Sequence, residues 1–218
     1  MTTALSYPFP QPPQISLAGP GPDAAGGAAP AGPARSRLTA VAEAVAAASG
    51  DAAFRSLVAE ADAMRDQRQW GRAEYLYWRA LGLHPLHPGY RVQYGHALKE
   101  QAKLADAEVA YRSAWALGET GEDLRQHILH VAGLQGDASP PLPAPRRAPG
   151  HPLDERPWQR DVELGFALLL HRAPGLATEV LPLLRAMPTR RAMLLALARR
   201  PETATANRDL MLLLAEEA

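Results

Sequence analysis

Three histidines come closest, in type and spacing, to a reactive site in this 218-residue sequence. His127 and His130 lie three residues apart, so on a helix they share one face, and His96 can approach them from a neighbouring helix. Two such histidines bind zinc when a carboxylate completes the ligand set, but the glutamate of a His-Glu-x-x-His pattern is missing here. We therefore expect no metal and no cofactor, and we interpret these histidines as structural or solvent-facing.

Motifs of catalysis are missing from the chain. It contains no glycine-rich phosphate loop, no Gly-x-Ser-x-Gly elbow and no Asp-x-Asp pattern for a metal-held sugar nucleotide. Cysteine is absent, which excludes disulfides, thiolate metal sites and cysteine nucleophiles. The 23 basic and 23 acidic residues give zero formal net charge, so no overall field attracts nucleic acid. We expect a protein that is not an enzyme and has no nucleic-acid partner.

Membrane insertion is not expected either. A spanning helix needs about 20 mostly apolar residues. The longest apolar stretches, Phe166–Leu170 and Met193–Ala198, are far shorter. The N-terminus has neither the basic nor the apolar region of a secretory signal, so the predicted location is the cytoplasm.

Proline and glycine divide the chain into four parts. Residues 1–35 are rich in both and are expected to form a disordered arm. Residues 137–157 hold seven prolines and are expected to form an extended linker. They separate a helical body at 36–136 from a C-terminal module at 158–218.

The body is an internal repeat whose period is about 34 residues, the length of a tetratricopeptide unit. Shifting the body by this repeat period places Ala73 on Ala107, Glu74 on Glu108 and Tyr77 on Tyr111. Small residues at two fixed places with an aromatic residue between them resemble the tetratricopeptide repeat. The resemblance implies antiparallel helix pairs stacked side by side. Its packing positions fall on Ala61, Ala73, Tyr77, Ala80, Pro85, Gly95, Ala107, Tyr111 and Ala114.

A third unit begins near Glu122 and ends after its first helix, with Gly136 at the family's internal turn. We expect the helices Ser36–Ser49 and Asp123–Leu134 to cap the stack, because a repeat array needs atypical end units. The expected fold class is all-α, with a short tetratricopeptide-like stack and a small helical module.

The amino-acid sequence of the units is similar to the repeat region that precedes bacterial glycosyltransferase domains. The similarity covers about residues 57–136 and includes the runs VQYGHALKEQ at 92–101 and LADAE at 104–108. No catalytic region follows, so only the repeat context carries over. The runs Arg160–Leu164 and Leu169–Pro174 resemble, more faintly, a small helical domain that accompanies the same enzymes.

In the family, the first helix of each unit lines a concave face that binds ligands. The corresponding residues of this sequence are Arg55, Val58, Asp62, Arg65, Asp66, Val92, His96, Lys99, Glu100, Asp123, Gln126 and His130. The mixture of charges suits a polar peptide or helix better than a polyanion. The alternative is that these residues are only the solvated surface of a structural stack.

The C-terminal module shows apolar residues at helical spacing in four short segments, separated by Gly175, Pro188 and Pro201. Thr189 is a candidate N-cap of the third. Arg190, Arg191, Arg199 and Arg200 form a basic cluster, which we interpret as a salt-bridged surface rather than a phosphate site. About 60 residues make a marginal core, so docking on the body or self-association is expected.

The function we expect is a non-catalytic interaction scaffold that binds another protein or a peptide segment in the concave face. The resemblance implies a setting in bacterial glycan assembly or protein glycosylation. Two alternatives remain at this point. One is an accessory subunit or remnant of a glycosyltransferase that contacts the acceptor, and the other is a purely structural oligomerisation module.

Overall fold

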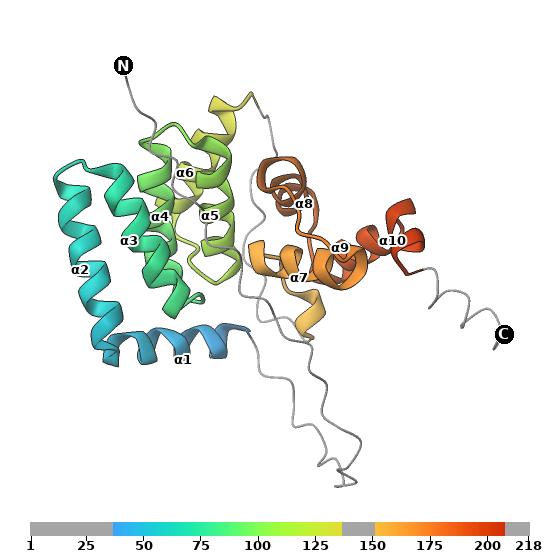
Figure 1. Cartoon of the computed structure of the whole chain (residues 1–218), viewed down its shortest axis with the longest axis horizontal. Helices are drawn as coiled ribbons and strands as arrows, with labels where there is room; N and C mark the ends of the chain where they lie inside the picture. The colour runs from blue at the N-terminus through green and yellow to red at the C-terminus, as the bar shows by residue number, and fades with distance from the viewer. Residues whose placement is uncertain (1–36, 137–150, 208–218) are drawn as a thin grey trace, which may run out of the picture. The chain divides into compact units, whose positions relative to one another are not determined.

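The computed structural model describes residues 37–136 and 151–207, and every element in these two ranges is helical. The predicted all-α fold is therefore confirmed (Figure 1). In the first range the helices are α1 (Arg37–Gly50), α2 (Ala52–Asp66), α3 (Trp70–Leu83), α4 (Pro88–Lys99), α5 (Leu104–Ala116) and α6 (Glu122–Leu134). In the second range they are the 3-10 turn η1 (Pro152–Asp154), α7 (Gln159–Leu170), the π-helical turn η2 (Leu176–Val180), α8 (Leu181–Ala186), α9 (Arg190–Ala198) and α10 (Pro201–Ala206).

Helices α2 to α6 are joined by short turns, and each packs on the next. They form the pairs α2/α3 and α4/α5, followed by α6 as the first helix of a third pair (Figure 1). The second helices begin at Trp70 and Leu104, and α4 and α6 begin at Pro88 and Glu122. Both kinds of helix therefore recur at the predicted repeat period, in a helical-repeat arrangement.

The turn within each pair is also repeated. Arg68, Ala102 and Gly136 follow one another at the repeat period and have positive φ angles of 56°, 58° and 73°. In the first turn Gln69 N–H donates to Met64 O at 2.8 Å, and in the second Lys103 N–H donates to Leu98 O at 3.1 Å. A hydrogen bond of this kind closes the C-terminal end of a helix that is followed by a residue with left-handed backbone angles. Gly136 has the same left-handed backbone conformation as Arg68 and Ala102.

Small residues and tyrosines fill the space between the pairs. The ring of Tyr77 is fully buried against Ala61, Ala73 and Ala97, and the last of these belongs to the next pair. Tyr111 is buried in the same way against α6. At the position equivalent to Ala61 stands Gly95, where a Cβ atom would lie 2.5 Å from the Tyr111 ring. Glycine is therefore the residue that allows this ring to pack.

The remaining packing positions lie as follows. Ala80, Ala107 and Ala114 have no exposed surface. Pro85 follows the end of α3, and its carbonyl accepts a 2.6 Å hydrogen bond from Arg91 Nη2 on α4. The first pair is thereby fastened to the second at this turn.

The C-terminal helices pack on α5. Val109 of α5 belongs to one buried cluster with Val162 and Phe166 of α7 and Leu184 of α8. Within the described residues, the body and the C-terminal helices belong to one compact unit. Of the two possibilities of docking on the body and self-association, docking is the one seen within the chain.

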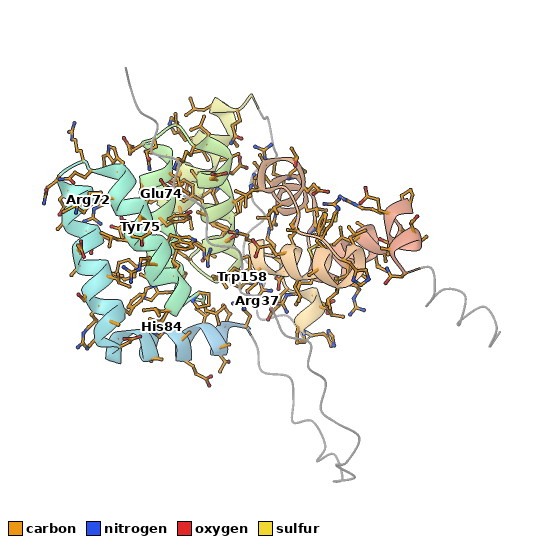
Figure 2. The ribbon with its side chains drawn as sticks, viewed as in Figure 1. Arg37, Arg72, Glu74, Tyr75, His84 and Trp158 are labelled. Carbon is orange, nitrogen blue, oxygen red and sulfur yellow. The ribbon has the colours of Figure 1, made fainter. Side chains whose placement is uncertain are left out.

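Arg37 connects α1 to this junction, as Figure 2 shows near Trp158. Its backbone N–H donates to Glu155 Oε1 at 2.9 Å, and its Nη2 donates to Asp161 Oδ2 at 2.8 Å. Its Nη1 also donates to the Ala116 carbonyl of α5 at 3.3 Å. The residue is 7% exposed, and burial lowers the pKa of Arg37. One side chain therefore joins α1, α5 and α7.

The predicted arm at 1–35 and residues 137–150 of the predicted linker lie outside the described residues. The rest of that linker, 151–157, contains η1 and the buried Glu155, so this part has a fixed place in the fold. Thr189 caps α9 by accepting a 3.1 Å hydrogen bond from Ala192 N–H. The last predicted apolar segment, around Leu210–Leu214, also lies outside the described residues.

The π-helical turn is a departure from the expected regular helix at 176–187. Pro182 follows η2 closely and has no N–H to donate to the carbonyl four residues earlier. A wider turn before the proline accommodates both the missing bond and the ring. Among the helices of the described ranges, none has the length and apolarity required to cross a bilayer.

Candidate binding face of the repeat helices

The first helices of the three units, α2, α4 and α6, carry two polar clusters that repeat the same design. In the first, the Tyr77 hydroxyl donates to Asp62 Oδ1 at 2.6 Å. In the second, the Tyr111 hydroxyl lies 2.8 Å from His96 Nδ1. One repeat period relates Asp62 to His96 and Tyr77 to Tyr111. A tyrosine ring buried between units thus presents its oxygen to the same position on the first helix.

The first polar cluster contains Asp62, Arg65, Asp66 and Tyr77. Arg65 Nη1 lies 2.9 Å from Asp62 Oδ1, and its Nη2 lies 2.9 Å from Asp66 Oδ1. Arg65 Nη1 also donates to Gln93 Oε1 on α4 at 3.1 Å. The side chains of Arg65 and Asp62 are 30% and 34% exposed. This cluster therefore bridges two units and still faces solvent.

The second polar cluster contains His96, Lys99, Glu100 and Tyr111. Lys99 and Glu100 occupy the positions equivalent to Arg65 and Asp66, and they form an ion pair of 3.0 Å. The ring of His96 meets that of His127 on α6 edge to face at a centroid distance of 4.5 Å. The order of cation, anion and tyrosine is therefore kept from one unit to the next.

The third unit has only part of this design. His130 stands at the position of Asp62 and His96 and is exposed. Gln126 and Asp123 are exposed as well, and the Gln126 amide is held by Glu122. The position that would supply a third tyrosine, residue 145, lies outside the described residues. In the part of the chain that is described, the series ends at His130.

Besides the three residues of α6, three more of the predicted face residues do not join these clusters. Val58 is 6% exposed and packs with Ala48, Phe54 and Ala80, so it is a core residue and not a ligand contact. Its equivalent, Val92, is half-buried against the core between α4 and α6. Burial therefore contradicts the prediction for Val58, whose register position points between helices, whereas Val92 is only half-buried and its role stays a prediction. Arg55 is exposed, but it donates to the Ser49 carbonyl at the end of α1, away from both clusters.

The sequence argument missed Gln93 as a residue of the face, but it did expect His127 to lie beside His96, as it does. Gln93 receives the bond from Arg65, and His127 stacks on Tyr111 with ring centroids 5.6 Å apart. One repeat period separates them, so they share a register position. Applying that period to His127 would have found Gln93.

Two histidines of the face, His96 and His127, are neutral at pH 7. Burial lowers the pKa of His96 to about 4, and the positive charges that His127 and Lys99 can carry act in the same direction. Burial also lowers the pKa of His127. The Tyr111 hydroxyl can therefore donate to an unprotonated His96 Nδ1. The tyrosines are likewise neutral, because burial raises the pKa of both Tyr77 and Tyr111.

The comparisons with known proteins assign no role to these residues, since no family model, curated protein or solved structure matches the chain. The geometry itself offers no metal centre. Within residues 37–136 and 151–207, no three His, Asp or Glu side chains are grouped to hold an ion. What remains on the face is a set of hydrogen-bonding groups with locally balanced charge.

Two pockets on the described residues are lined by other side chains. One lies between α2 and α3 beside Trp78 and Leu83. The other lies at the α1 junction between Arg37 and Trp158. Neither contains a residue of the two polar clusters. The Arg65 and Asp62 side chains of the first polar cluster are partly exposed, and such a surface suits an extended or helical segment better than an enclosed small molecule.

Proposed function

We propose that the chain is a non-catalytic interaction module that binds a polar peptide segment of another protein across α2, α4 and α6. The observation that supports this proposal most is the recurrence of one polar cluster at the repeat period. A segment that lies across successive first helices meets the same kinds of donors and acceptors in each unit. Such repetition suits a chain-like ligand, whose backbone also repeats its hydrogen-bonding groups.

The charges of the face favour a peptide over a polyanion. Arg65 is already paired with two aspartates, and Lys99 is paired with Glu100. Little positive potential is left to attract a nucleic acid or another run of phosphates. A peptide with both signs of charge can exchange these internal pairs for intermolecular ones without leaving a charge buried.

A peptide-display selection tests the proposal without knowledge of the partner. The full chain is immobilised and a random peptide library is selected on it, with the triple variant Asp62→Lys, His96→Ala and Lys99→Glu used for comparison. We expect enriched peptides to bind the wild type and to lose at least tenfold in affinity on the variant. Equal binding to both proteins would show that this face is not the binding surface.

A matched control keeps the test specific. Glu60→Lys makes the same change of charge on α2 as Asp62→Lys, at an exposed residue two positions earlier on another side of the helix. We expect the selected peptides to bind Glu60→Lys as they bind the wild type. If Glu60→Lys weakens binding as much as Asp62→Lys does, the effect comes from net charge and the proposal fails.

The setting that we propose is cytoplasmic and rests on the resemblance to the repeat region of bacterial glycosyltransferases. The module would hold a partner near machinery for glycan assembly or protein glycosylation. Calorimetric titration with nucleotide-diphosphate sugars separates this role from a glycosyltransferase subunit. We expect no saturable heat, and saturable binding would overturn the non-catalytic assignment.

A further inference from the structure

The outer faces of the two second helices, α3 and α5, differ in one respect. Residues of α3 at this face are exposed: Tyr75 is 53% exposed, Trp78 43% and Leu83 48%. The residues one repeat period later are Val109, Arg112 and Leu117, and their exposures are 1%, 5% and 1%. The same face of the repeat is thus open in the first unit and covered in the second.

The cover on α5 is a leucine-rich part of the same chain. Val109 packs in one cluster with Val180, Leu181 and Leu184 of η2 and α8. Polar groups fix the contact, since Arg185 of α8 donates to both oxygens of the buried Glu108. Within the molecule, this position of the repeat therefore packs against a helical segment that carries leucines and one arginine, whose charge is opposite to that of Glu108.

The exposed face of α3 suits a segment that is apolar, as η2 and α8 are, but that carries negative charges where α8 carries Arg185. Tyr75 and Trp78 stack with ring centroids 6.2 Å apart, and the guanidinium of Arg79 lies 5.8 Å from the Tyr75 ring. The α2/α3 pocket adjoins them, and a Cβ atom at Gly82 would meet nothing within 4 Å. The surface is therefore both aromatic and hollowed.

Its charge is positive. Arg72 and Arg79 are exposed, and neither forms an ion pair with a residue of the described ranges. The acid of the same helix, Glu74, is engaged by Lys103 at 2.6 Å and by Gln101 at 2.7 Å. An apolar segment that carries carboxylates would complement this face.

We propose that residues 209–217 of a second copy of the chain dock on this outer face of α3. The segment has the sequence DLMLLLAEE, which joins a run of leucines and a methionine to three acids. Among the described residues of the C-terminal helices, Leu164, Leu168 and Leu195 are also exposed. They are unsuited to α3, because the exposed Arg160, Arg191 and Arg199 lie beside them in sequence and would repel Arg72 and Arg79.

We place the segment on a second copy because the described residues end at Asn207, far along the chain from α3. Asn207 Nδ2 donates to the Leu169 carbonyl of α7 at 2.8 Å, and α7 packs on α5. The main partners of α3 are instead α2 and α4. Figure 1 shows α10 and α3 on opposite sides of α5. Docking is therefore head to tail, a heterologous contact that links one copy to the next.

Photocrosslinking in the full chain tests this contact. Tyr75 is replaced by p-benzoylphenylalanine, and the purified protein is irradiated at several concentrations. We expect covalent dimers whose yield rises with concentration and whose adducts map to residues 209–217. Absence of dimers, or adducts outside 209–217, would overturn the proposal. Leu134, 57% exposed on α6, is replaced in the same way as a control and is expected to give no such adduct.

A charge exchange adds a second, independent readout. The pair Arg72→Glu and Arg79→Glu is expected to lower the dimer yield at least fivefold, with unchanged circular dichroism because both side chains are exposed. Mixing this protein with a copy carrying Glu216→Arg and Glu217→Arg is expected to restore the yield. No loss, or a loss without restoration, would contradict docking by these acids. The proposal is independent of the peptide-binding face, so either can fail alone.

Discussion

Gly95 shows how one missing methyl group positions the tyrosine of the second polar cluster. Its absent Cβ leaves room for the Tyr111 ring, and the hydroxyl of that ring reaches His96 on the binding face. At the equivalent position of the first unit, Ala61 performs this role for Tyr77 with a slightly larger side chain.

We predict that Gly95→Ala destabilises the protein. A Cβ atom there would lie 2.5 and 2.7 Å from two ring atoms of Tyr111, so the ring must shift. Overpacking of this kind costs about 1–3 kcal/mol. Denaturant unfolding measures the loss. Gly82→Ala is the control, because its new methyl group meets nothing and a helix gains about 1 kcal/mol from alanine. Equal effects of the two substitutions would contradict the close packing.

We predict a contribution of His96 to the pH dependence of stability. Its pKa is about 4 in the folded protein against 6.5 in the unfolded chain, so below pH 6.5 the unfolded state binds more protons. Stability is fully present above pH 6.5 and is lost as the pH falls towards 4, by up to about 3 kcal/mol. His127, Lys99 and Arg65 add to this effect, and Glu100 opposes it.

Unfolding free energies at pH 7.5 and 4.5 check this prediction. The difference between the two pH values is expected to be smaller in His96→Gln than in the wild type. His130→Gln, at the exposed equivalent position on α6, is expected to keep the wild-type difference. If both variants behave alike, burial of His96 does not govern the effect.

The repeat period predicted which residues occupy equivalent positions, but it did not predict which way their side chains point. Asp62 and His96 lie in equivalent places on the face, as the repeat period implies. Val58 and Val92 are equivalent too, but they point between helices, which a shift alone does not reveal. His127 was expected beside His96, and Gln93 shares the register position of His127, so the repeat period applied to that histidine would have indicated it.

At the scale of the element, the helix pair is closed by a left-handed residue that need not be glycine. Arg68 and Ala102 adopt positive φ at the turns that precede α3 and α5. The hydrogen bond across each turn holds the conformation in place. Of Arg68, Ala102 and Gly136, only the glycine adopts it without strain.

We predict that Ala102→Gly stabilises the protein. A residue with a Cβ atom pays about 1–2 kcal/mol in the left-handed region, and glycine avoids most of this cost. For a chain of this size the melting temperature should rise by about 2–4 °C. Gly136→Ala should lower the melting temperature by a similar amount. A Cβ atom at this residue meets no other atom, so the substitution adds only the strain of the left-handed backbone. A fall in melting temperature for Ala102→Gly would contradict the turn geometry.

The helices themselves were largely predictable, because their apolar periodicity and caps are local properties. The expected segments Ser36–Ser49 and Asp123–Leu134 differ from α1 and α6 by at most one residue at each end. The π-helical turn before Pro182 was not expected. It depends on a helix continuing through a proline, and sequence rules place a helix boundary there instead.

At the scale of the molecule, a buried carboxylate joins the repeats to the C-terminal helices. Glu108 has no exposed surface and is held by Arg112 at 2.7 Å, Arg185 at 2.9 Å and Gln135 at 2.8 Å. The repeat shift aligns it with Glu74, which binds Gln101 in the same way. The sequence therefore revealed the pair of acids, but not that one would be buried, because burial depends on the docking of α8.

We predict very different costs for removing these two acids. Glu108→Ala leaves the 5% exposed guanidinium of Arg112 without its partner, which costs about 3–5 kcal/mol. Glu74→Ala breaks a contact with Lys103, whose side chain is 43% exposed, and should cost at most about 1 kcal/mol. Urea titrations of both variants supply the comparison. Similar losses would mean that the docking contact contributes little to stability.

The recurrence of the turns at Gln69 and Lys103 has a consequence for how such a molecule can grow. Both sites begin a second helix with the same hydrogen-bonded turn, and the ends of the array are closed by α1 and by the helices docked on α5. A tandem duplication of residues 70–103 would insert one whole unit between α1 and α5, and it would therefore separate Arg37 from its partners on α5 and α7. The lengthened protein would present three polar clusters instead of two, but α1 would need a new anchor in place of this junction.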